Sequence, residues 1–206
     1  MGLEQTGIQA VIWDMGGVLI RTEDRRPRTE LAKKFGFTYE MLESIVYGSS
    51  SAQEASVGRI TADAHWMKVK ALLKMEDNFL PEFQRAFWAG DVLDEELVAR
   101  IDHLRPAIKT GLLSNAWDNA RETVGKQFGF LYAFDVSVFS AELKMEKPNP
   151  AFYHWMLDQL QVQPDAAIFI DDMPENVKAA EKLGLHGIRF INRDQIIKDL
   201  QEFLPF

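Results

Sequence analysis

Short apolar runs that end in polar residues recur along this chain. In the first, residues 11–13 stop at Asp14, which Gly16 and Gly17 follow closely. Uninterrupted apolar runs of this kind, containing Val and Ile, are typical of buried strands. A carboxylate directly after such a strand lies where an open parallel sheet places its ligand crevice. The two glycines allow the backbone to turn sharply and to approach a ligand closely.

Three later apolar runs also end in polar groups, among them hydroxyls, an ammonium group and carboxylates. These runs and the polar residues after them are 108–113 with Ser114 and Asn115, 134–139 with Ser140 and then Lys147, and 167–170 with Asp171 and Asp172. Taken alone, each polar residue fits a turn or a helix cap equally well. Four such strand ends in one chain instead predict a shared site, because parallel strands bring their carboxyl ends to one edge of a sheet.

Residues 21–92 carry only helical patterns. Residues 21–30 hold four arginines, three acidic residues and a proline, which predicts a solvated exit from the first strand. Thr61 is a plausible helix cap, and Trp66 and Val69 begin an apolar face at helical spacing. The aromatic residues near the end of the segment indicate a packed core. The segment therefore predicts a small helical bundle inserted after one strand.

After the insertion, strand and helix patterns alternate to a last strand at 187–191 and a last helix at 193–203. Such alternation predicts an α/β fold with a doubly wound parallel sheet and helices on both faces. We therefore expect a core domain made of residues 1–20 and 93–206. The helical cap domain is expected at residues 21–92.

Composition narrows the classes of partner and of chemistry. The chain has 206 residues, a formal net charge of -8 and no cysteine. The acidic balance disfavours nucleic acid and anionic membrane surfaces as partners. Without cysteine, disulfides, thiolate metal sites and a cysteine nucleophile are excluded. No apolar run is long enough to span a bilayer and no secretory signal opens the chain, so we expect a cytoplasmic protein.

The predicted site contains carboxylates from two distant segments, Asp14 and the pair Asp171 and Asp172. Carboxylates that converge repel each other unless a cation or a proton neutralises them. Oxygen ligands without histidine or cysteine suit a hard cation such as Mg²⁺. The histidines of the chain lie in different elements without ligand spacing, so we assign them no metal role.

The remaining site residues are suited to binding phosphate. The hydroxyl of Ser114, the amide of Asn115 and the ammonium of Lys147 are groups that hold phosphoryl oxygens. An aspartate beside a metal ion and such groups can act as a nucleophile and form an aspartyl-phosphate. Metal and ammonium would stabilise the charge on the transferring group. Asp14 is the candidate for this nucleophile.

Four segments resemble, in order, the four motifs of the haloacid dehalogenase-like (HAD) hydrolase superfamily. They are Asp14-Met15-Gly16-Gly17-Val18-Leu19, Leu113-Ser114-Asn115, Lys147-Pro148-Asn149-Pro150 and Phe169-Ile170-Asp171-Asp172. The helical insertion resembles the small helical cap of that superfamily, so that the resemblance covers essentially the whole chain and implies a Rossmann-like HAD core. It also implies that the cap closes over the site and selects the substrate.

The resemblance assigns roles to single residues. It implies that Asp14 is the nucleophile, that Ser114 holds the phosphoryl group and that Lys147 neutralises both nucleophile and phosphate. Asp172 would be a direct Mg²⁺ ligand, assisted by Asp171 directly or through water.

The sequence departs from the motif at Gly16. Phosphatases of the superfamily usually carry there a second aspartate, which acts as general acid and base. The backbone carbonyl, which is the usual metal ligand at this position, is retained by Gly16. Loss of the acid weakens proton donation by about 10²–10⁴-fold unless another group replaces it. Glu23 or Asp24 is a candidate replacement, and a leaving group of low pKa, such as the anomeric hydroxyl of a sugar phosphate, needs less help.

Two other functions stay open. One is a metal-independent 2-haloacid dehalogenase, which uses the same aspartate and also lacks the second one. By resemblance, members of that branch have a Ser-Asn sequence where this chain has Asp171 and Asp172. The carboxylate pair therefore favours the phosphatase. The other is a catalytically weak member of the superfamily that serves as a binding or regulatory protein, for which Gly16 is the support.

The sequence does not identify the substrate beyond a small phosphorylated metabolite. Arg59 in a predicted cap loop is a candidate contact by resemblance, although a solvated surface position fits it as well. Trp117 fits either a position facing the cleft or a packing role. We expect no nucleic-acid or membrane partner, and a monomer or a homodimer.

Overall fold

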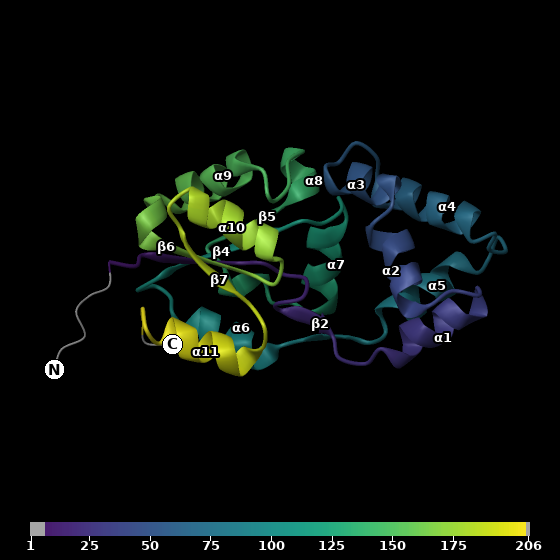
Figure 1. Ribbon diagram of the computed structural model, residues 1–206, viewed down its shortest axis with the longest axis horizontal. Coiled ribbons are helices and arrows are strands. Elements are labelled where there is room, and N and C mark those ends of the chain that lie inside the picture. Colours follow the sequence, from purple (N-terminus) through teal and green to yellow (C-terminus); the bar gives the residue numbers. More distant parts are fainter. Residues whose placement is uncertain (1–6, 205–206) are drawn as a thin grey trace.

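The computed structural model describes residues 7–204 of the chain. Its centre is a parallel sheet of five strands in the order β5-β4-β1-β6-β7, with helices on both faces (Figure 1). The strands are β1 Ala10–Trp13, β4 Lys109–Ser114, β5 Val136–Phe139, β6 Ala167–Asp171 and β7 His186–Arg189. The predicted doubly wound α/β fold is confirmed.

Strand β1 is apolar throughout because both of its faces are covered. Val11 and Trp13 point into one hydrophobic cluster with the helices on one face of the sheet, whereas Ala10 and Ile12 point into a second cluster with the helices on the other face. Successive side chains of a strand alternate between the two faces of a sheet, which accounts for this division. The helices of the sheet domain are α6 Glu95–His103, α7 Ala120–Gln127, α8 Ser140–Leu143, α9 Pro150–Leu160, α10 Pro174–Lys182 and α11 Arg193–Leu200.

Five further helices lie at one end of the sheet, and all but the third of them pack around a separate hydrophobic cluster (Figure 1). They are α1 Arg26–Lys34, α2 Tyr39–Tyr47, α3 Ser50–Ser56, α4 Ala62–Leu72 and α5 Leu80–Trp88. Thr38, Ser49 and Thr61 begin three of them, each accepting a hydrogen bond from the main-chain N–H three residues later. The aromatic residues near the end of the segment, Phe79, Phe83, Phe87 and Trp88, lie in this cluster, as expected. Within residues 7–204, no helix combines the length and apolar character required to cross a membrane.

The helical segment is joined to the sheet domain by two strands that the sequence did not predict. β2 Ile20–Thr22 and β3 Asp91–Leu93 pair antiparallel, so that the chain leaves the sheet domain and returns to it side by side. Strands of three residues are too short to show a period, and the prediction of helices alone over 21–92 was wrong here. The predicted domain boundaries at 20/21 and 92/93 fall inside these strands, and the domain division itself stays a prediction.

Two strand boundaries differ from the predicted ones by more than one residue. β5 begins at Val136, because Leu131–Ala133 form a short 3-10 helix ahead of it. β7 covers His186–Arg189 and ends earlier than predicted.

The prediction of a fully solvated exit over 21–30 was wrong for Arg28. Its side chain is 3% exposed and donates hydrogen bonds to Glu43 at 2.6 Å, to Asp91 at 3.1 Å and to the carbonyl of Phe87 at 3.1 Å. Its guanidinium also lies 4.1 Å from the centre of the Phe87 ring. Arg28 therefore ties α1, α2 and α5 to strand β3 through one buried cation.

We predict that Arg28→Ala lowers the free energy of unfolding by about 3 kcal/mol or more, because the carboxylate of Asp91 loses its buried partner. Urea unfolding followed by circular dichroism measures this loss. Arg26→Ala is the matched control, since Arg26 pairs with Asp24 at the surface and its removal should leave stability unchanged. Equal and small effects of both substitutions would contradict the proposed anchor.

Candidate active site

The carboxyl ends of three neighbouring strands form the rim at which the predicted residues lie. β1 pairs with β4 on one side and with β6 on the other, all parallel. Asp14 follows β1, Ser114 ends β4 and Asp171 ends β6. These three side chains are buried. The polar ends of the apolar runs therefore do meet at one edge of the sheet.

Lys147 reaches this rim from the loop between α8 and α9. Its Nζ lies 2.6 Å from Asp14 Oδ1 and 2.7 Å from Asp171 Oδ2. The residue is buried, and burial alone would lower the pKa of its ammonium. The two carboxylates outweigh burial and raise that pKa, so Lys147 stays charged. One cation thus holds carboxylates from β1 and β6 together.

The side chain of Asn115 holds the backbone of Lys147. Its Nδ2 donates to the carbonyl of Lys147 at 2.9 Å, and its Oδ1 accepts from the N–H of Lys147 at 2.8 Å. The phosphate contact predicted for Asn115 would therefore come from its main-chain N–H, because the side-chain amide is already engaged.

Asn176 belongs to the site but was missed in the sequence. Its Nδ2 lies 3.1 Å from both carboxylate oxygens of Asp171, and the N–H of Met173 donates to Asp171 Oδ1 at 2.8 Å. Tyr153 donates in turn to the carbonyl of Asn176 at 3.0 Å. The available signal was position, since Asn176 lies in the first turn of the helix that Pro174 opens after the two aspartates.

The donor set fits a hard divalent cation. Asp14, Asp171 and Asp172 each offer a carboxylate oxygen, and these atoms lie within 4.8 Å of one another. Gly17 leaves room for Asp172, because an added Cβ would lie 2.5 Å from Asp172 Oδ2, and its φ of +78° favours glycine. Burial and the charge of Asp171 raise the pKa of Asp172. A cation with oxygen ligands would relieve this repulsion.

Burial also dominates at Asp14. It raises the pKa of this carboxyl from 3.8 to about 7, against the lowering effect of Lys147 and with a further increase from Asp171. A carboxylate in this state is poised between a neutral acid and a charged nucleophile, and a nearby cation would favour the charged form.

Gly16 and Trp117 contrast in their surroundings. Gly16 is exposed, and an added Cβ would meet no atom within 4 Å. Trp117 packs against the helical segment, with its ring centre 4.6 Å from that of His65 and 5.5 Å from that of Trp66. Of the two roles considered for Trp117, the structure therefore shows the packing role. Arg59 is exposed, and its predicted substrate contact stays a prediction.

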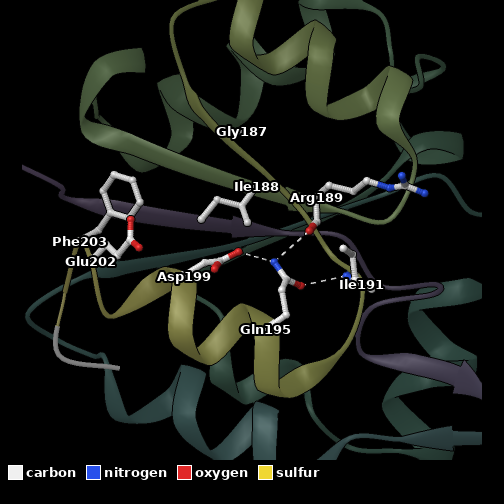
Figure 2. A pocket seen from close by; sticks show the side chains of 8 residues that line it. All are labelled: Gly187, Ile188, Arg189, Ile191, Gln195, Asp199, Glu202 and Phe203. Atoms are coloured by element: carbon white, nitrogen blue, oxygen red, sulfur yellow. Dashed lines mark hydrogen bonds between the residues drawn. The ribbon is translucent and has the colours of Figure 1, made fainter.

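A hollow of about 450 Å³ lies elsewhere, between strand β7 and helix α11. None of its lining residues is a predicted site residue. Gln195 closes the edge of the strand there, accepting from the N–H of Ile191 at 3.0 Å and donating to the carbonyl of Arg189 at 3.2 Å (Figure 2). One lining residue, Arg189, adjoins the carboxylate rim, because its Nε donates to the carbonyl of Asp172 at 3.2 Å.

Comparison with known families agrees with this geometry. The family model of the haloacid dehalogenase-like hydrolases matches residues 8–184. The chain belongs to this family. The resemblance of the four motifs is thereby confirmed at the level of the family.

Curated relatives of this HAD-like hydrolase carry different activities. Bifunctional epoxide hydrolase 2 from Sus scrofa is 23% identical over 219 residues, covering 95% of this chain and 38% of the relative. Validoxylamine A 7'-phosphate phosphatase from Streptomyces hygroscopicus subsp. limoneus is 22% identical over 206 residues, covering 94% of this chain and 95% of the relative. The chain therefore spans little more than a third of the first relative and nearly all of the second.

Solved structures show the same fold. A HAD family enzyme from Bacteroides thetaiotaomicron, in complex with magnesium and inorganic phosphate, is 25% identical and aligns with a TM-score of 0.74 over 88% of this chain and 93% of the other. L-2-haloacid dehalogenase from Xanthobacter autotrophicus is 18% identical, with a TM-score of 0.63 over 96% and 85% of the two chains, and this likeness concerns the fold alone.

The raised pKa of Asp14 predicts how stability depends on pH without metal. Between 3.8 and about 7 the folded state holds a proton on Asp14 that the unfolded chain has lost. This contribution to stability is therefore full below the lower value and is lost as the pH rises towards the upper one.

Mg²⁺ should raise the urea midpoint more at about pH 7.5 than at about pH 5.5, because protons compete with it. Asp172→Asn should weaken this gain. A gain in the variant as large as that of the wild-type protein at both pH values would contradict the metal site.

Proposed function

We propose that this HAD-like hydrolase is a magnesium-dependent phosphatase that acts on a small phosphorylated metabolite through an aspartyl-phosphate on Asp14. The observation that carries the proposal is the contact between Asp14 and the Lys147 ammonium at 2.6 Å, beside Asp171 and Asp172. A nucleophilic carboxylate needs a nearby cation to approach an anionic phosphate ester. This rim provides the ammonium of Lys147 and has carboxylate ligands for a metal ion.

In the proposed reaction, a carboxylate oxygen of Asp14 forms a bond to phosphorus while the bond to the leaving-group oxygen breaks. Water then attacks the phosphoryl group, which releases inorganic phosphate and restores the carboxylate. Lys147 offsets the charge of Asp14 and of the phosphoryl oxygens, and Ser114 holds one of these oxygens. Asp14, Asp172 and the carbonyl of Gly16 would hold the metal, assisted by Asp171; when bound, it supplies positive charge at the phosphoryl group.

The leaving group is the part of the substrate that the site constrains most. Gly16 cannot donate a proton, and the carboxylate of Asp24 is a poor substitute, because its hydrogen bonds with Arg26 lower its pKa. Glu23 is paired with Arg21 at 3.1 Å. We therefore propose a substrate whose leaving group has a low pKa, as a sugar phosphate esterified at its anomeric oxygen does.

The comparisons support a phosphatase without defining its substrate. One relative is a phosphatase for validoxylamine A 7'-phosphate, and the structural neighbour from Bacteroides thetaiotaomicron is a complex with magnesium and inorganic phosphate. The dehalogenase reading shares the fold, but without a metal ion three converging carboxylates would have to share the ammonium of Lys147, which would be costly. Asp171 and Asp172 therefore favour the phosphatase.

We predict Mg²⁺-dependent hydrolysis of p-nitrophenyl phosphate, with a loss of about 10⁴-fold or more in kcat for Asp14→Asn, because the nucleophile is removed. Asp158→Asn, at an exposed position of α9, is the matched control and should keep full activity. Metal-independent halide release from 2-chloropropionate would support the dehalogenase instead. Activity that survives Asp14→Asn would overturn the proposed mechanism.

Gly16→Asp tests the missing acid, because the structure leaves open space for a side chain at this position. We expect kcat to rise by about 10-fold or more on alkyl phosphates, which need a proton, and to change little on p-nitrophenyl phosphate, which does not. Gly17→Ala is the contrasting control, since its Cβ would collide with Asp172 and should abolish activity on both substrates. Equal changes on both substrates for Gly16→Asp would speak against a missing proton donor.

A further inference from the structure

Away from the two linking strands, hydrogen bonds from the helical segment reach two loops of the sheet domain. In the first loop, which follows Ser114, Asp118 Oδ1 accepts from the N–H of Ala62 at the start of α4, at 2.8 Å. The second connection runs from the start of α8 to Lys147, and in it Ser140 and Glu146 both bond to Ser56 at the end of α3. The loops that hold the helical segment are thus the loops that carry two predicted phosphate-binding groups.

Ser140 joins both loops to the helical segment through one hydroxyl. The side chain is fully buried, and its Oγ accepts from the N–H of Ala116 at 2.9 Å. The same oxygen lies 3.2 Å from Ser56 Oγ, and its proton has the carbonyls of Ser56 and Ala116 within reach. A shift of α3 therefore changes the partners of the loop that begins at Ser114.

Ser56 makes the corresponding contact beside Lys147. Its hydroxyl donates to the carboxylate of Glu146, the residue directly before Lys147. The backbone of Lys147 is held from the other side by the side chain of Asn115, which belongs to the first loop. Hydrogen bonds thus link the helical segment to Asn115 and to the backbone of Lys147, and the Lys147 side chain continues the chain of contacts to Asp14.

We propose that Ser56 and Ser140 are positioning residues, through which the docked helical segment fixes the two loops that place Ser114 and Lys147. The proposal rests on the phosphatase function above for the roles of those two groups. Neither serine is bonded to Asp14 in the structure; each acts through a loop. Displacement of a catalytic group by about 1 Å can cost about 10²-fold in rate, so contacts of this kind have measurable consequences.

The first arm of the test is hydrogen exchange, measured by mass spectrometry on the ligand-free full chain. We expect Ser56→Ala and Ser140→Ala each to speed exchange by roughly 10-fold in peptides covering 114–118 and 145–149, because local opening of these loops becomes easier. Faster exchange confined to 50–62 would overturn the coupling. These rates are read without substrate, so they decide on the coupling whatever the phosphatase assay shows.

The second arm is the steady-state hydrolysis of p-nitrophenyl phosphate with Mg²⁺. We expect Ser56→Ala to lower kcat/KM by about 10-fold and to weaken inhibition by inorganic phosphate by a similar factor, since the phosphate-holding groups are displaced. Ser56→Thr, which keeps the hydroxyl, should restore both values. A change in kcat alone, with phosphate inhibition intact, would overturn the positioning role.

Ser49→Ala is the matched control. Ser49 caps the same helix α3, accepting from the N–H of Ala52 at 3.3 Å. Its loss should speed hydrogen exchange within residues 50–56. It should leave exchange within residues 114–118, inhibition by phosphate and kcat/KM unchanged. If Ser49→Ala affects the two loops as strongly as Ser56→Ala does, general loosening of the helix explains the result and the proposal is wrong.

Discussion

The ammonium of Lys147, held between two buried carboxylates, is the interaction on which the rest of the structure depends. Asp14 and Asp171 come from neighbouring strands, and both approach the lysine within 2.7 Å. When both carboxyl groups are ionised, one ammonium leaves a net negative charge at this buried site, and burial makes that charge costly. The structure therefore needs further hydrogen bonds at every member of the group, and a cation bound there would be stabilised by the same charge.

The hydrogen bonds that support this group come from side chains that take no part in the proposed chemistry. Asn115 fixes the backbone of Lys147, and Asn176 fixes the carboxylate of Asp171. Each of these amides offers both donor and acceptor groups, so it can orient a charged neighbour without adding charge of its own. Strong charges in the centre with neutral groups around them allow a nucleophile to be both buried and precisely oriented.

The helical segment has a different physical basis. It has a hydrophobic cluster of its own and is tied to the linking strands by the buried cation Arg28. Further contacts with the sheet domain include hydrogen bonds from Ser56 and Ala62, and the ring of Trp117 packs against this cluster. We propose that this segment moves relative to the sheet domain without unfolding, as selection of a substrate by a closing cap would require.

The sequence predicted what local patterns determine. Apolar runs indicated the five main strands, and the polar residues at their ends indicated Asp14, Lys147 and Asp171 as neighbours. Arg28 could not be recognised as buried, because its partners lie 15 and 63 residues away and no local pattern links them. Asn176 and Ser140 were missed as contact residues for a related reason. An amide in a first helical turn and a serine after a strand are ordinary cap residues until the structure shows which groups they face.

The stereochemical course at phosphorus tests the central claim most directly, that Asp14 takes the phosphoryl group before water does. The measurement uses a phosphorothioate monoester made chiral at phosphorus with two oxygen isotopes. The wild-type protein hydrolyses it with Mg²⁺ in water enriched in the third isotope, so that the thiophosphate released is itself chiral. Each in-line displacement inverts the configuration. Transfer to Asp14 followed by transfer to water therefore predicts overall retention. Overall inversion would show that water attacks the substrate directly, and Asp14 would then not be the nucleophile.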